Sequence, residues 1–389
     1  MKSLRANLRK TKDPNRRSVA ICCSTGCTAH GSAAVVTAFE EELAGSSDVE
    51  ILTTGCHGFC EKGPIVVVKP EGIFYHAVAP EDVEEIVEKT LENGEIVEHL
   101  LYTDPQTGEK IVKEKDIPFY KYQERTIFGS NGEIDPTRIE DYIATGGYGA
   151  LVKAFRMKPE EIIDEVKNSG LRGRGGAGFP TGAKWEFTRN APGQPKYIIC
   201  NADEGDPGAF MDRSLLEGNP HIVLEGMLVG AYAIGASRGF FYVRNEYPLA
   251  VKHLAQAIEK MREYGLLGEN ILGSGFSFDL EICRGAGAFV CGEETALIAS
   301  IEGRAGEPRP RPPYPAQSGL WGQPTNINNV KSWANVTIIL KNGSEAYRRI
   351  GTATSTGTMI FSLVGKINNT GLVEIPMGIT LREMIYNIG

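Results

Sequence analysis

The stretch from Ser169 to Phe187, SGLRGRGGAGFPTGAKWEF, combines backbone freedom with charge and aromatic rings. Six glycines lie between Gly170 and Gly182, and glycine lets the backbone approach a ligand and turn its N–H groups toward it. Basic side chains can bind a phosphate, and aromatic side chains offer flat faces for rings. The stretch therefore predicts a nucleotide-binding loop. Its charged and aromatic candidates are Arg172, Arg174, Lys184, Phe179, Trp185 and Phe187.

Part of this stretch, Gly173–Gly178, fits the G-x-G-x-x-G fingerprint of dinucleotide-binding turns. That fingerprint is informative only between a strand and a helix. Here the preceding run, Pro159–Ser169, has the pattern of an amphipathic helix, and Pro180 argues against an immediate helix start. We therefore predict a glycine-rich loop after a helix rather than a Rossmann turn. A flexible surface loop is the competing interpretation, because loops often have this composition.

Length and composition describe an ordinary globular protein. The 389 residues suffice for two to three domains, with 41% hydrophobic and 23% charged residues. No apolar run reaches the length of about 18 residues that a transmembrane helix requires. The net charge of −8 argues against general nucleic-acid binding. We expect a cytoplasmic protein.

The order of apolar runs predicts an α/β protein with several parts. A basic arm, 1–17, lacks the apolar stretch of a signal peptide. Residues 18–95 read as strand, helix, strand, hairpin and helix, and the polar segment 96–136 reads as a linker. Strands alternate with helices over 137–354, which predicts a mostly parallel sheet with ligand loops at the strand ends. Residues 355–389 look like the unfinished start of a β-rich unit.

Within 137–354, apolar runs predict individual strands. They are Lys196–Cys200, Gly239–Arg244 and Phe278–Cys283. The asparagine-rich run that begins at Asn326 is expected to open a helix reaching about Leu340.

Five of the eight cysteines precede residue 61, and no secretory signal accompanies them, so a disulfide framework is not expected. Cys22-x4-Cys27 and Cys56-x3-Cys60 place two thiol pairs on two loops that each follow a predicted strand. Four thiolates can hold a zinc ion or an iron–sulfur cluster, and these wide spacings favour the bulkier cluster. Spacing alone does not decide between Cys22 and Cys23.

With these four cysteines, the first domain resembles the thioredoxin-like [2Fe–2S] ferredoxins, whose pattern is C-x4-C followed by C-x3-C. The resemblance implies that Cys22, Cys27, Cys56 and Cys60 bind a [2Fe–2S] cluster and that Cys23 is spare.

Four further motifs occur in order: GLRGRGGAGFPTG at Gly170–Gly182, CNADE at Cys200–Glu204, GAFVCGEET at Gly287–Thr295 and QSGLWG at Gln317–Gly322. They resemble the NADH-binding flavoprotein subunit of respiratory complex I. The likeness is closest to relatives with a ferredoxin domain fused in front, such as the NADH-linked beta subunit of electron-bifurcating [FeFe]-hydrogenases. It covers nearly the whole chain. It also implies that the last segment begins a β-grasp domain of the SLBB type.

The resemblance implies two neighbouring sites. The FMN site would use Gly173, Arg174, Gly176, Lys184, Asn201, Asp203, Glu204, Gly292, Asn328 and Asn329. The dinucleotide site would use Phe179, Phe187, Glu293, Glu294, Arg311 and Tyr314. Without the family, CNADE would read as an Asx turn, and the two glutamates as a charge pair at a helix N-terminus. Carboxylates beside the ribose disfavour a 2′-phosphate, so NAD is expected rather than NADP.

The sequence departs from the complex I pattern at a few positions. Phe289 replaces a tyrosine, Arg311 a lysine and Tyr314 a phenylalanine, which preserves ring or charge in each case. The family continues to a C-x2-C-x2-C segment that holds a [4Fe–4S] cluster, but no cysteine follows Cys291. We expect that cluster in a part missing from this sequence.

The implied activity is hydride exchange between NAD(H) and FMN, with subsequent transfer of single electrons to iron–sulfur clusters. No side chain is expected to act as a general acid. The implied partners are a small thioredoxin-like [2Fe–2S] subunit and a large iron–sulfur catalytic subunit of hydrogenase or formate dehydrogenase type, with ferredoxin as a further partner. The alternative is an electron-relay or scaffold subunit that does not bind nicotinamide, against which the complete aromatic and Glu-Glu motifs argue.

Overall fold

The computed structural model describes residue 8 and residues 16–389. By its internal contacts the chain divides into two units, here called the large unit and the small unit. The large unit consists of Thr145–Met359 and Pro376–Gly378. The small unit consists of the chain up to Ala144 together with Ile360–Ile375 and Ile379–Gly389. This division differs from the predicted one, since the segment after 355 is shared between the units.

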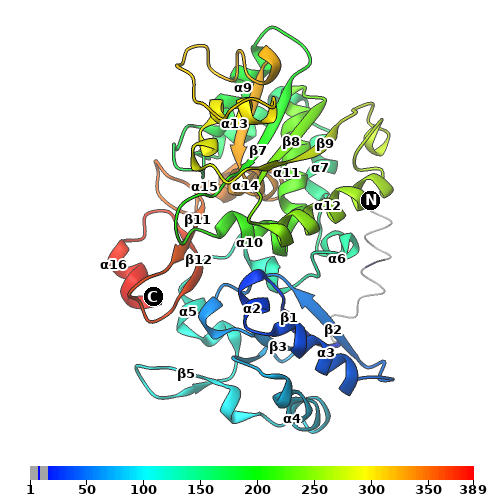
Figure 1. Ribbon diagram of the computed structural model, residues 1–389, viewed down its shortest axis with the longest axis vertical. Coiled ribbons are helices and arrows are strands. Elements are labelled where there is room, and N and C mark those ends of the chain that lie inside the picture. The colour runs from blue at the N-terminus through cyan, green and yellow to red at the C-terminus, as the bar shows by residue number, and fades with distance from the viewer. Residues whose placement is uncertain (1–7, 9–15) are drawn as a thin grey trace. The chain divides into compact units, whose positions relative to one another are not determined.

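The small unit contains a four-stranded sheet in the order β2-β1-β3-β4 (Figure 1). β1 pairs with β2 in parallel, and the pairs β1–β3 and β3–β4 are antiparallel. The predicted strands, hairpin and helices between residues 18 and 95 are confirmed. Their bounds are β1 Arg17–Cys22, α2 Thr25–Ala29, α3 Ser32–Glu42, β2 Val49–Thr54, β3 Val66–Lys69, β4 Ile73–Tyr75 and a final helix from Pro80 to Glu92 that includes α4 Val83–Glu85.

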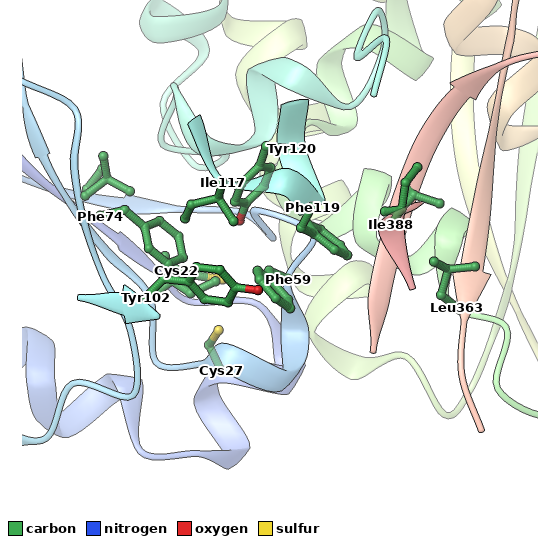
Figure 2. Packing of buried hydrophobic residues seen from close by; sticks show 14 of the residues in the cluster. Cys22, Cys27, Phe59, Phe74, Tyr102, Ile117, Phe119, Tyr120, Leu363 and Ile388 are labelled. Carbon is green, nitrogen blue, oxygen red and sulfur yellow. The ribbon is translucent and has the colours of Figure 1, made fainter. Parts of the chain in front are cut away.

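Residues 96–136, predicted as a linker, form part of the core of the small unit. Phe119 stacks on Phe59 with ring centroids 4.1 Å apart, and Tyr102 lies 5.7 Å from Phe59 (Figure 2). The expectation of a linker is thereby corrected: the buried side chains are irregularly spaced, so no helical or strand period marks them. The elements of this segment are β5 Tyr102–Thr103, β6 Lys110–Ile111 and α5 Pro118–Lys121, and α6 Ile139–Ala144 follows it.

The last part of the chain also packs into the small unit. Leu363 and Ile388 belong to the same buried cluster as Phe59 (Figure 2). Leu372 donates its backbone N–H to Gly58 O at 2.8 Å. The β-rich character predicted here is confirmed, whereas the assignment as the start of a β-grasp domain stays a prediction. The elements are β11 Thr358–Leu363, β12 Gly371–Pro376, α16 Leu381–Glu383 and a final helical turn, Met384–Ile388.

The large unit is built on a second four-stranded sheet, in the order β10-β7-β8-β9 (Figure 1). Every neighbouring pair is parallel, as the alternation of strands and helices predicts. One strand was missed, because Asn326–Asn329 is a strand and not the start of a helix. Asparagine rarely occurs in strands, but Asn326 and Asn328 are fully paired with β7 here. The strands are β7 Tyr197–Ala202, β8 Arg238–Arg244, β9 Asp279–Gly285 and β10 Thr325–Asn329.

Helices contribute the apolar side chains that cover this sheet. Leu297 and Ile298 of α13 (Glu294–Ile301) pack with side chains of β7, β8 and β10. On α11 (Pro220–Ile234), Gly226 and Gly230 leave room for α14 (Val330–Asn342): a Cβ on Gly226 would lie 1.9 Å from Trp333 O. Such close approach of two helix backbones requires glycine.

Pro180 does not delay a helix, contrary to the sequence prediction. α9 begins at Thr181, directly after it, because Pro180 is the N-cap residue and lies outside the helical turns that a proline would break. The helix before the glycine-rich stretch, α8, is confirmed, and α10 is one that the sequence pattern did not reveal. The remaining bounds are α7 Gly149–Ala154, α8 Pro159–Asn168, α9 Thr181–Asn190, α10 Met211–Gly218, α12 Pro248–Glu263 and α15 Ser344–Arg348.

The predicted basic arm, residues 1–17, lies almost entirely outside the described residues. Within the described ranges, no helix combines the length and the apolar character needed to cross a bilayer.

Candidate functional site

The carboxyl ends of β7 and β10 lie side by side in the large unit. β7 has β8, the next strand along the chain, as its neighbour at one edge, and β10 as its neighbour at the other edge. Such a switch point in a parallel sheet opens a crevice in which ligands bind. The register pairs Asn201 at the end of β7 with Asn329 at the end of β10. Two of the predicted site residues therefore meet at this switch point.

The glycine-rich stretch between α8 and α9 is an ordered loop. Gly173 donates its N–H to Phe179 O at 2.9 Å, and the Arg172 side chain donates to Gly178 O at 2.8 Å. A Cβ on Gly175 would lie 3.0 Å from the Cβ of Asn329, so the loop lies against the end of β10. Gly176 has a φ of 109°, which a residue with a side chain rarely adopts. The competing interpretation of a flexible surface loop does not fit these contacts.

The side chain of Arg174 is buried beneath this loop. Its guanidinium donates to the carbonyls of Arg172, Thr356 and Thr358 at 2.9, 2.6 and 3.1 Å. The charge expected to face a phosphate is instead used to hold the loop in place.

Trp185 also differs from its predicted role as an open ring face. It is fully buried, with its ring centroid 5.5 Å from that of Trp333. Its Nε1 donates to Asn328 Oδ1 at 3.1 Å, and Asn326 Nδ2 donates to the same oxygen at 2.6 Å. The side-chain oxygen of Asn328 is therefore engaged within the protein.

Lys184 of α9 is the first of three side chains of alternating charge. Its Nζ forms an ion pair with Glu294 and donates to Ile327 O at 2.7 Å. Arg311 approaches the other carboxylate oxygen of Glu294 at 3.8 Å. The structure thus brings Lys184, Glu294 and Arg311 together.

Glu293 has a different environment from Glu294. Its carboxylate caps α13, accepting from the backbone N–H groups of Thr295 and Ala296 at 2.8 and 3.0 Å. Burial alone would raise the pKa of Glu293, but these hydrogen bonds and that from the Thr295 hydroxyl outweigh it and lower the pKa. The expectation of a helix-terminal charge fits Glu293.

The tip after β7 holds two carboxylates with raised pKa values. Asn201 Nδ2 donates to Gly292 O at 2.9 Å, and Asn201 Oδ1 accepts from Asp203 N at 3.0 Å, which forms the Asx turn. Within the described residues, the buried Oδ2 of Asp203 has no hydrogen-bond partner. Burial raises the pKa of Asp203 to about 6, and burial together with the charge of Asp212 raises the pKa of Glu204 to about 7.

Five aromatic side chains in the described part of the large unit are open to solvent: Phe179, Phe187, Phe289, Tyr314 and Trp321. Phe179 and Phe187 are about half exposed, at 49% and 55%, with ring centroids 6.4 Å apart. Tyr314 and Phe289 are also exposed, and a Cβ on Gly205 would lie 2.5 Å from the Phe289 ring. Phe179 and Phe187, which lie near each other, offer exposed ring faces of the kind that bind planar ligands or partners.

The small unit gathers the predicted cysteine ligands at the ends of β1 and β2. The Sγ atoms of Cys56 and Cys60 are 3.5 Å apart. Hydrogen bonds with the thiols of Cys27 and Cys56 raise the pKa of Cys22 well above its usual value, and the bond from Cys22 lowers that of Cys56. Cys23 packs against the other buried cluster of the small unit, and burial, with a smaller contribution from the charge of Cys27, raises the pKa of its thiol to about 12. The structure therefore joins Cys22, rather than Cys23, to the other thiols.

The surroundings of these thiols fit an iron–sulfur cluster. Gly58 donates its N–H to Cys56 Sγ at 3.2 Å, and a Cβ on Gly63 would lie 2.8 Å from Cys27 Sγ. No three His, Cys, Asp or Glu side chains in the described part of the chain are arranged around a single metal ion. A [2Fe–2S] cluster has a different requirement, since its four cysteines are shared between two irons.

Two families match these two regions. Residues 166–338 match the Nuo51 FMN-binding domain, and residues 8–91 match the thioredoxin-like [2Fe–2S] ferredoxin. The chain joins a thioredoxin-like [2Fe–2S] ferredoxin domain to a Nuo51 FMN-binding domain. The resemblance stated from the sequence motifs is thereby confirmed at the level of both domains.

Similar proteins are subunits of hydrogenases and of NADH-quinone oxidoreductase. "NADP-reducing hydrogenase subunit HndC" of Solidesulfovibrio fructosivorans is 60% identical over 69% of this chain and 55% of its own length. A subunit of the NADH-quinone oxidoreductase of Aquifex aeolicus is 54% identical over 64% of this chain and 58% of its own length. The chain thus spans somewhat more than half the length of these relatives.

A solved structure is similar over almost the whole chain. The crystal structure of an NAD⁺-reducing [NiFe]-hydrogenase in the air-oxidized state has a TM-score of 0.60 and 29% identity. The similarity covers 99% of this chain and 64% of that one.

The large unit fits FMN in several respects. The glycine loop lies at the switch point, and the buried Oδ2 of Asp203, on the tip after β7, has unused hydrogen-bonding capacity for a hydroxyl. Lys331 and Asp212, which sequence reasoning missed, lie buried behind this tip. No sequence pattern marks them, because the helix of Lys331 also contains Ser332, Asn335 and Lys341.

Proposed function

We propose that the chain is the NADH-oxidising flavoprotein subunit of a larger redox enzyme. It would exchange hydride between NAD(H) and FMN and pass single electrons to iron–sulfur clusters. The observation that carries this proposal is the meeting of the glycine loop, the CNADE tip and Asn329 at one switch point of the FMN-binding domain. When bound, FMN supplies the conversion between a two-electron hydride and single electrons.

In this proposal the loop and strand ends hold the flavin. Backbone N–H groups around Gly173 and Gly176 would receive the phosphate, and Asn201, Asp203 and Asn329 would bind the ribityl hydroxyls. Arg174 acts from behind, because its guanidinium is engaged within the protein. Asn328 Oδ1 already accepts two hydrogen bonds, so Asn328 would reach the ligand through Nδ2, and Asn201 and Asn329 through the second hydrogen of their amide nitrogens.

The nicotinamide dinucleotide would lie on the open aromatic surface. Phe179, Phe187 and Tyr314 offer exposed ring faces for stacking. Glu294 would accept from the ribose or the carboxamide, and its ion pairs with Lys184 and Arg311 hold it in place. A carboxylate at the ribose favours NAD over NADP.

Cys22, Cys27, Cys56 and Cys60 would bind the [2Fe–2S] cluster of the small unit. By analogy with relatives that are named as subunits of a hydrogenase and of NADH-quinone oxidoreductase, we propose a cytoplasmic assembly. Its partners would be a thioredoxin-like [2Fe–2S] subunit and a large iron–sulfur catalytic subunit, of hydrogenase or formate dehydrogenase type.

Titration of the FMN-loaded chain with NAD⁺ and NADP⁺, followed through flavin fluorescence, tests the nucleotide site. NAD⁺ should bind more tightly than NADP⁺, and Phe179→Ala and Glu294→Gln should weaken NAD⁺ binding by about tenfold or more, which corresponds to about 1.4 kcal/mol. Tyr122→Ala, an equally exposed aromatic of the small unit, is the matched control. A chain that binds FMN but neither nucleotide would support the relay or scaffold alternative instead.

A further inference from the structure

A lysine and an aspartate are buried together at the edge of the flavin-binding domain's switch point. Lys331, in the first turn of α14, is 2% exposed, and Asp212, in the first turn of α10, is 3% exposed. Their side chains form an ion pair. Lysine is almost never buried unless it is paired, and buried ion pairs contribute little net stability compared with apolar side chains of similar size. The pair therefore calls for an explanation other than stability.

Asp212 divides its two carboxylate oxygens between two partners. Oδ1 binds Lys331 Nζ, and Oδ2 accepts from Asn329 Nδ2 at 2.6 Å. Asn329 Oδ1 in turn accepts from the backbone N–H of Lys331 at 2.9 Å. Both ends of the Asn329 amide are thus fixed, one by the carboxylate and one by the helix start, and a flipped amide would lose both bonds.

The first turn of α10, which contains Asp212, also supports the tip after β7. The N–H of Asp212 donates to both carboxylate oxygens of Glu204, at 3.0 and 3.1 Å. The N–H of Arg213 donates to Glu204 Oε2 at 3.3 Å, and the Tyr247 hydroxyl lies 3.4 Å from that oxygen. One ion pair is therefore connected both to Asn329 at the end of β10 and to Glu204 at the end of β7.

Asn329 is the point at which this network meets the loop. A Cβ on Gly175 would lie 3.0 Å from the Cβ of Asn329, so the loop packs directly on that residue. Without the Asp212 side chain, Asn329 would lose the acceptor that orients its amide, although the backbone of β10 would remain paired with β7.

We propose that Asp212 and Lys331 are a positioning pair: their buried ion pair fixes the Asn329 amide beside the glycine-rich loop and thereby sets the affinity for the ribityl chain of the flavin. The inference rests on the proposed flavin site and adds residues that touch no ligand themselves.

The test is a flavin titration of the apoprotein with FMN, riboflavin and lumiflavin, for the wild type and for Asp212→Leu/Lys331→Met, which leaves Asn329 without its side-chain acceptor. The double variant removes both charges together, so no buried charge is left unpaired. FMN and riboflavin, which both contain the ribityl chain, should each bind about tenfold more weakly. Lumiflavin, which lacks that chain, should bind as it does to the wild type. Asp279→Asn/Arg262→Met removes an exposed ion pair of the same unit and is the matched control.

Unchanged FMN affinity in the double variant would overturn the inference. Equal weakening of all three flavins would also overturn it, because that pattern means a general loosening of the unit. If the double variant does not fold, Asp212→Glu gives the same test, since it keeps the charge but displaces the acceptor from Asn329. Failure of the wild type to bind FMN would instead contradict the proposed function.

Discussion

At the scale of single residues, the carboxylate of Asp203 is buried without a full set of hydrogen-bond partners in the described structure. Its buried Oδ2 lacks a hydrogen-bond partner in the described structure, and burial raises its pKa to about 6. An unfolded aspartate has a pKa of about 4, so between these values the folded chain binds a proton that the unfolded chain has released. Ionised Asp203 therefore lowers the stability of the apoprotein, an effect absent below about pH 4 and complete above about pH 6.

Replacing Asp203 by Asn should make the apoprotein more stable at neutral pH, by about 1–2 kcal/mol in the free energy of unfolding, and should leave it unchanged at about pH 4. Urea unfolding at both pH values measures the difference. Asp279→Asn, at an exposed carboxylate, is the control. An equal effect at both pH values would show that the buried charge is not the cause. The variant should also bind FMN more weakly, because the same carboxylate that destabilises the apoprotein is proposed to bind a ribityl hydroxyl.

The two adjacent cysteines give a second residue-scale prediction. Cys22 shares hydrogen bonds with the thiols of Cys27 and Cys56 and belongs to the same buried cluster as Cys27, whereas Cys23 packs against another cluster. Cys22→Ala, which removes the donor atom, should therefore abolish the visible absorption of the [2Fe–2S] cluster, while Cys23→Ala should retain it, with iron content measured in parallel. Retention of the cluster in Cys22→Ala together with its loss in Cys23→Ala would reverse the assignment.

Residue type alone did not reveal how each side chain is used. Arg174, Trp185 and Lys184 all lie in or beside the glycine-rich stretch, as residues of a phosphate and ring site would. Yet Arg174 and Trp185 are buried against segments distant in sequence, and only Lys184 remains beside Glu294. Which face a side chain turns to the protein depends on tertiary packing, which a motif does not encode.

At the scale of elements, the apolar strands of the large unit were predicted, whereas the polar strand β10 and the helix α9 were missed. β7, β8 and β9 are apolar runs, but β10 is the polar run TNINN, which enters the sheet because its backbone pairs with β7. α9 was missed because Pro180 was taken as a barrier to a helix, although as the N-cap residue it lies outside the helical turns.

Helix contact gives a prediction at this scale. Gly226→Ala on α11 should lower the free energy of unfolding by about 3 kcal/mol or more, because its Cβ would lie 1.9 Å from Trp333 O and the helices must separate. Thermal and urea unfolding measure the loss. Gly149→Ala, at a helical glycine with nothing within 4 Å of the added Cβ, should change stability by less than about 1 kcal/mol. Similar losses in both variants would contradict this account of α11 and α14.

At the scale of the whole molecule, each unit is assembled from segments far apart in the chain. In the small unit, the buried carboxylate of Glu374 accepts from the N–H groups of Ile127 and Phe128 at 3.1 and 2.9 Å. The sequence identified the small α/β domain and the parallel sheet, because these depend on local periodicity. It did not reveal that 96–136 and 360–375 belong together with the first domain, because such pairings depend on contacts between distant positions.

The central claim is that this chain accepts hydride from NADH through FMN, and one measurement tests it most directly. The full-length protein, loaded with FMN and with its [2Fe–2S] cluster, is mixed anaerobically with NADH while flavin absorbance is recorded. The account predicts that NADH bleaches the flavin, with about 1.5 equivalents of NADH per FMN for complete reduction, since FMN takes up two electrons and the [2Fe–2S] cluster one. Bleaching should be strongly slowed in Phe179→Ala and retained in Tyr122→Ala. Full FMN occupancy without bleaching by NADH would contradict it.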